Sequence, residues 1–143
     1  MNQLARSAPA YLLAAFLVFM GVQKFVGDVP IFKIIEANVL ARTGLNIDLI
    51  DPAGRYMTGA LELLAAILLI LRRFWGALLS TGVIAGAILA HLTFLGISTP
   101  MSSGTDAPES PMLFIMALIF FGISILVLWL ARLIAAEKSQ PLS

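Results

Sequence analysis

Four long apolar runs decide what this chain can fold into. They cover about residues 9–26, 52–71, 74–97 and 111–133. As α-helices, such runs are long enough to cross the roughly 30 Å hydrocarbon core of a bilayer. Of the 143 residues, 60% are hydrophobic and only 12% are charged, and the mean hydropathy is +0.99, far above that of a soluble domain. We therefore predict an all-α protein, an integral membrane four-helix bundle that forms a single domain over residues 1–143.

Turn chemistry marks the ends of these runs. The pairs Asp51-Pro52 and Ser110-Pro111 each join a residue that caps free backbone N–H groups to a proline suited to the first helical turn. The pair Arg72-Arg73 leaves a two-residue turn, so the second and third spans must be antiparallel. Four spans place both termini on the same side of the membrane.

We predict a further short helix in the connection between the first two spans. Residues 30–42 have a helix-like composition but are too few to span, and Gly44 is a natural C-terminal stop. We expect this segment to lie at the membrane interface or to be re-entrant. A connecting helix that simply covers the end of the bundle and a gating lid are both compatible with the sequence.

The basic residues predict the orientation of the bundle. Within the first run, the most apolar segment (residues 11–20) is followed by Gly21-Val22-Gln23 rather than a small-residue cleavage site, so we expect a retained helix and not a signal peptide. Cytoplasmic loops carry an excess of Lys and Arg. The terminal side has five such residues and the opposite side four, so we predict cytoplasmic N and C termini; the two sets are Arg6, Arg72, Arg73, Arg132 and Lys138 against Lys24, Lys33, Arg42 and Arg55.

Composition also excludes several functions. The chain has no cysteine and one histidine, which removes disulfides, zinc and iron–sulfur sites with cysteine ligands, and a bis-histidine haem within one chain. No metal site is predicted. A net charge of +1 without a basic block makes nucleic acid an unsuitable partner. A redox role would therefore need a bound small molecule or a partner subunit.

Glu62 is the most informative single residue. It lies inside the second span between Leu61 and Leu63, with no Lys or Arg within a turn along the chain. A carboxylate at this depth costs several kcal/mol unless it is neutral, paired or in contact with water. A functional role is therefore favoured, and a purely structural hydrogen bond between helices is the alternative.

Helix rise places the other polar residues relative to Glu62. At about 1.5 Å per residue from the Arg72-Arg73 turn, Glu62 lies about 15 Å and His91 about 27 Å into the membrane. We expect a ring of four residues near the far interface, with Glu62 about 10 Å deeper and reachable by a lysine side chain or a water molecule. The ring consists of Lys24, Arg55, Tyr56 and His91.

Each ring member also has a simpler interpretation. Lys24 and Arg55 taken singly are typical of residues whose charged ends reach the interface, and His91 is equally compatible with a satisfied structural role. Their convergence at one end is what favours a binding site. On the third span, Gly82, Gly86 and Ala90 form a stripe of small residues, for which helix packing is favoured over a ligand groove.

Three segments resemble the DoxX family of small four-helix membrane proteins. They are residues 21–25 (GVQKF), 59–65 (GALELLA) and 91–97 (HLTFLGI), and the resemblance covers about residues 10–134. It implies a bacterial inner-membrane protein linked to redox metabolism, because the name-giving member is a subunit of a thiosulfate:quinone oxidoreductase. Many members have no assigned activity, and animal relatives in the wider superfamily are assembly chaperones for receptors.

Two functions of different classes follow. In the first, Lys24, Arg55, Tyr56, Glu62 and His91 bind a quinone-like or other amphipathic molecule and support electron transfer by a partner subunit. Quinone carbonyls need hydrogen-bond donors and a nearby proton source, which these residue types supply. In the second, the chain is a non-enzymatic accessory or assembly subunit. Its polar cluster then only joins its own helices, and the Gly82/Gly86 stripe or the short helix contacts another membrane protein or a second copy of the chain. Proton-coupled transport is less favoured, because the sequence shows no internal repeat or broken helix.

Overall fold

Four long helices form the bundle. The computed structural model describes residues 3–27, 29–100 and 106–139. The long helices are α1 (Gln3–Val26), α3 (Arg55–Leu71), α4 (Arg73–Ala90) and α5 (Met112–Ser139). The π-helical turns η1 (Ile50–Gly54) and η2 (His91–Leu95) extend α3 and α4, and all four spans are long and apolar enough to cross a membrane. The predicted all-α four-helix bundle is confirmed, and the chain is a multi-pass membrane protein.

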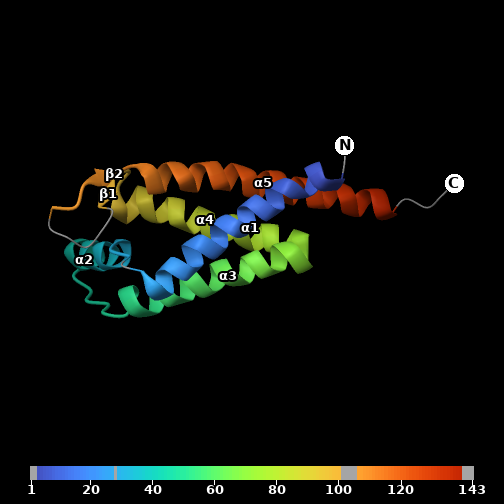
Figure 1. Cartoon of the computed structure of the whole chain (residues 1–143). Coiled ribbons are helices and arrows are strands. Elements are labelled where there is room, and N and C mark those ends of the chain that lie inside the picture. Colours follow the sequence, from blue (N-terminus) through green and yellow to red (C-terminus); the bar gives the residue numbers. More distant parts are fainter. Residues whose placement is uncertain (1–2, 28, 101–105, 140–143) are drawn as a thin grey trace.

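The two ends of the bundle differ. Both termini lie at one end, which we name the terminal end (Figure 1). The short helix α2 (Ile31–Thr43) lies at the other, which we name the α2 end. Here the strands β1 (Thr99–Pro100) and β2 (Glu109–Ser110), which the sequence analysis did not predict, pair antiparallel. The rest of the predicted polar loop, residues 101–105, lies outside the described residues.

Two helices are longer than predicted. α1 begins at Gln3 and includes Pro9, where the start was expected. α5 continues six residues past position 133, through a stretch rich in strong helix formers. There Arg6 Nη1 donates a 3.0 Å hydrogen bond to Glu137 Oε2, which joins the first and last helices at the terminal end.

Of the two predicted helix caps, one is confirmed and one is wrong. Ser110 Oγ accepts a 3.2 Å hydrogen bond from the Met112 N–H, as a capping serine should. Asp51 does not cap, because the helix begins one residue earlier and the Asp51 carboxylate lies 3.8 Å from Arg55 Nε. The free N–H of Asp51 instead donates to Glu36 Oε2 at 3.1 Å, so the capping group comes from α2.

α2 is held by both helix ends that it covers. As predicted, it stops at Gly44, whose φ of 70° is readily adopted only by glycine. Besides the Glu36 contact to η1, Asn38 Nδ2 donates to the Phe94 carbonyl at 2.7 Å, and Arg42 Nη1 donates to the Thr93 carbonyl. An acidic side chain thus meets a helix N-terminus and a basic one meets a C-terminus, which is the favourable pairing with the helix dipoles.

The bundle core is built by successive helix pairs. α1 packs mainly on α3, α3 on α4, and α4 on α5, while contacts between α1 and α4 are few. Leu13, Leu17 and Leu69 are almost completely buried at the centre. Between α4 and α5, Thr81 Oγ1 donates a 3.0 Å hydrogen bond to Ser124 Oγ, a polar contact of the kind that joins helices within membranes.

α3 and α4 touch at the terminal end and separate toward the α2 end (Figure 1). Their contact depends on Gly76, where an added Cβ would lie 2.2 Å from the Leu69 backbone nitrogen. A side chain at this position would force the two helix backbones apart. The space between the diverging helices is where the candidate site lies.

We predict that Gly76→Ala lowers the melting temperature of the purified protein, because the added methyl group overlaps the α3 backbone. Gly122→Ala on α5 is the matched control, since an added Cβ there meets nothing within 4 Å. The control should be neutral or stabilising by up to about 1 kcal/mol. Thermal unfolding in detergent, followed by circular dichroism, measures both; equal melting temperatures would contradict the close approach.

Candidate functional site

A close crossing of α1 and α3 creates the polar part of the site. An ideal Cβ at Gly21 would lie 3.1 Å from the Gly59 carbonyl oxygen, and one at Gly59 would lie 3.2 Å from the Gly21 carbonyl oxygen. The two glycines therefore let the helix backbones approach closely. Lys24 follows Gly21 by three residues and Glu62 follows Gly59 by three, so both ionisable side chains lie one turn from the crossing.

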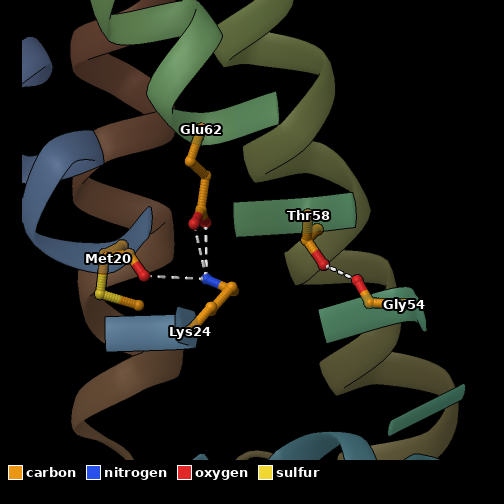
Figure 2. Close-up of polar contacts among 5 residues, drawn as sticks. All are labelled: Met20, Lys24, Gly54, Thr58 and Glu62. Atoms are coloured by element: carbon orange, nitrogen blue, oxygen red, sulfur yellow. Dashed lines mark hydrogen bonds and ion pairs between the residues drawn. The ribbon is translucent and has the colours of Figure 1, made fainter. Parts of the chain in front are cut away.

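Lys24 and Glu62 form an ion pair inside the bundle (Figure 2). Lys24 Nζ lies 2.8 Å from Glu62 Oε1 and 2.7 Å from Oε2, and a longer 3.4 Å contact joins it to the Met20 carbonyl. Only 5% of Lys24 and 7% of Glu62 is exposed. The expected contact through a long lysine side chain is confirmed, and it is direct.

The pair changes the interpretation of Lys24. Its ammonium group is directed back along α1 toward Met20 and does not extend to the interface, so the snorkelling interpretation is wrong. Removing two charges from water is costly, and a buried ion pair often contributes little net stability compared with apolar side chains of similar volume. The pair is therefore weak as a structural device, and its place on a cavity wall favours a functional role.

A cavity of about 830 Å³ lies beside the ion pair. All four long helices and α2 contribute to its wall, and most lining side chains are apolar. The polar exceptions are Lys24, Thr58, Glu62 and His91. The Thr58 hydroxyl already donates to the Gly54 carbonyl (Figure 2). Ligand sites in proteins have this size and this character, with few convergent polar groups in an apolar wall.

His91 is held by the backbone turn that ends the third span. Gly96 has a φ of 80°, and its N–H donates to the His91 carbonyl at 2.8 Å. The Gly96 carbonyl oxygen lies 2.9 Å from His91 Nδ1. When the Nδ1–H donates to this oxygen, a neutral ring keeps its lone pair on Nε2. His91 is 5% exposed and is packed against Phe114, with ring centroids 5.4 Å apart.

The predicted ring of four residues does not form. Arg55 and Tyr56 are not among the described residues that line the cavity. Arg55 instead faces Asp51 and donates to the Tyr56 hydroxyl at 3.2 Å, with its guanidinium carbon 4.8 Å from the Tyr56 ring centroid. Tyr56 is exposed and stacks on Phe25. The structure thus places Lys24, Glu62 and His91 on the wall of one cavity, and leaves Arg55 and Tyr56 outside it.

The helix packing expected of the small-residue stripe is also not found within the described chain. An added Cβ at Gly82 or Gly86 would meet nothing within 4 Å, and both glycines line the cavity together with Ala90. Sequence reasoning also missed the lining residues of α2, which are Ile31, Phe32 and Ile35. Their spacing of one and three residues was visible, but nothing in the sequence indicated which way α2 would face.

No protein-family model, curated protein or solved structure matches this chain. The resemblance to the DoxX family therefore stays a prediction that rests on the three short segments.

We predict that Glu62→Leu alone reduces the free energy of unfolding by about 3–5 kcal/mol, because it leaves the Lys24 ammonium buried without a partner. The double variant Lys24→Met, Glu62→Leu should recover most of that loss, since no charge remains. Unfolding in mixed detergents, followed by circular dichroism, measures both.

Arg55→Gln is the control for this comparison. It removes a charge from a half-buried and longer ion pair outside the cavity, with Arg55 Nε 3.8 Å from Asp51 Oδ1, so it should destabilise the protein less than Glu62→Leu does. A double variant as unstable as Glu62→Leu would show that the two charges are not energetically coupled.

Proposed function

We propose that this protein binds a quinone-like amphipathic molecule in the cavity and thereby supports electron transfer by a partner protein. The observation that carries the proposal is the position of a buried ion pair and a buried histidine on the wall of an otherwise apolar cavity. A quinone head group needs a few polar contacts, and the rest of the molecule needs apolar surroundings. The resemblance to the DoxX family points to the same ligand class.

The polar groups suit the chemistry of a quinone. Reduction adds two electrons and two protons to form a quinol; the electrons would come from the partner protein. Lys24 is a hydrogen-bond donor of the type that a quinone carbonyl oxygen needs. Its ammonium group contacts both Glu62 oxygens, and its contact to the Met20 carbonyl is longer, at 3.4 Å. Glu62 and the Nε2 atom of His91 are groups that exchange protons. Binding and proton exchange are therefore the roles proposed for these three residues.

The position of Lys24 also supports the proposed orientation. Because Lys24 lies in the bundle core, it does not count as a loop charge. The α2 end then has three basic residues, against five at the terminal end. The excess favours cytoplasmic termini. We propose that the protein lies in the bacterial inner membrane with the α2 end facing outward.

The binding proposal predicts that decylubiquinone binds saturably to the wild-type protein in lipid nanodiscs. The double variant Lys24→Met, Glu62→Leu should bind at least about tenfold more weakly, since a lost charge-assisted hydrogen bond is worth 1.4 kcal/mol or more. Titration calorimetry or quenching of tryptophan fluorescence measures the affinity.

Two control variants make this test specific. Arg55→Gln and Tyr56→Phe change residues outside the cavity, so they should bind as the wild type does. Equal binding by the wild type and the Lys24, Glu62 double variant would contradict the proposal. The accessory-subunit alternative would then become the better account.

The orientation is tested with single cysteines in a chain that has none. Ala37→Cys on α2 and Ala135→Cys on α5 are exposed and leave the charges unchanged. In intact bacterial cells, a membrane-impermeant maleimide should label position 37, whereas position 135 should react only after lysis. The reverse pattern would place the termini outside.

A further inference from the structure

Among the described residues, the exposed part of the cavity wall lies on one helix face, which we take as its opening. Its described lining residues are buried or half-buried on α1, α2, α3 and α5, and the exposed ones all lie on α4. The exposed lining residues follow one another along α4 at intervals of one, three or four positions, so they form a continuous stripe along the helix. The exposed lining residues are Trp75, Leu78, Gly82, Gly86 and Ala87.

This opening lies within the hydrocarbon region. The third span covers Arg73–Leu95, and the stripe is apolar throughout. At about 1.5 Å per residue, Gly82 lies about 14 Å from the turn between α3 and α4, and Glu62 on the neighbouring helix lies about 15 Å from it. The opening is therefore level with the ion pair, and lipid chains are the medium that surrounds it.

The α2 end is closed by comparison. Phe32 is 8% exposed, and its neighbours in the wall, Ile31 and Ile35, are half-buried. Side chains of α2 bond to the backbone of both π-helical turns: Asn38 donates to a carbonyl of η2, and Glu36 accepts from an N–H of η1. Water-soluble molecules arriving at this end meet a tethered helix.

We propose that the ligand reaches Lys24 and Glu62 sideways from the bilayer, through the opening on α4, with its apolar chain lying along Gly82 and Gly86. The ligand class is thus a membrane-dissolved amphiphile with a single long chain rather than a water-soluble metabolite. This inference rests on the proposed function, because it specifies how the same cavity is filled. Two glycines within one helix interior lower helix propensity, and no neighbouring atom of the described chain requires them, so open space is what they provide.

The experiment fills the opening and compares it with a matched position. In a Trp129→Phe background, Trp75 is the single remaining tryptophan and reports on the cavity wall. Gly86→Leu places a side chain in the opening, whereas Gly122→Leu makes the same change on α5 at a position that is also open but does not line the cavity. Decylubiquinone is the probe, in nanodiscs, with stopped-flow quenching of Trp75 as the readout.

We expect Gly86→Leu to slow association of the probe at least tenfold, Gly86→Ala to have an intermediate effect, and Gly122→Leu to stay within twofold of the parent. Asn38→Ala, which removes one tether of α2, should leave the association rate within twofold. Circular dichroism and gel filtration verify that each variant folds.

Two failures remain distinguishable. If the parent protein binds the probe and Gly86→Leu behaves like Gly122→Leu, or if Asn38→Ala accelerates association, the sideways path is wrong while the proposed function stands. If the parent protein itself shows no saturable binding, the proposed function fails, and this inference fails with it.

Discussion

The cost of burying a charge within a membrane span is the constraint that organises the candidate site, because Lys24 and Glu62 meet this cost by pairing with each other. Either charge alone would be expensive within a membrane span, so each makes the other tolerable. The pair forms because Gly21 and Gly59 let α1 and α3 approach closely one turn away. α3 and α4 diverge beside this crossing (Figure 1), and the pair lies on the wall of the cavity there.

The two ends of that cavity are held by different physical means. At the terminal end, Gly76 lets α3 and α4 touch, so the space between them closes. At the α2 end, a short helix covers the gap with Phe32 and supplies Glu36 to one helix N-terminus and Arg42 to one helix C-terminus. These contacts satisfy backbone groups at helix ends that have no partner within their own helix. Covering the cavity and capping the helices are therefore one arrangement.

The resulting site combines three environments within a few helical turns. The ion pair and His91 supply the polar groups, the surrounding wall is apolar, and the stripe at Gly82 and Gly86 is exposed on a predicted membrane span. A water-soluble ligand would gain little from such surroundings, because most of its polar groups would lose hydrogen bonds on binding. The long-chain amphiphile that we propose as ligand would use all three environments at once.

The sequence by itself determined the four spans, the short helix that stops at Gly44, and the need of Glu62 for a partner, because apolar length, turn chemistry and the cost of a buried charge are local properties. Only the tertiary structure decided which partner that is. Counting helix rise locates a Cα atom, whereas the Lys24 side chain is directed back toward Met20 and ends at the carboxylate.

The same limit explains the two remaining errors. Arg55 shares a helix face with Glu62 in the sequence, yet its side chain bonds to near neighbours, and a stripe of small residues reads identically whether it meets a helix or an open cavity. Those outcomes depend on side-chain direction and on the divergence of α3 and α4, which arise only when the helices are assembled.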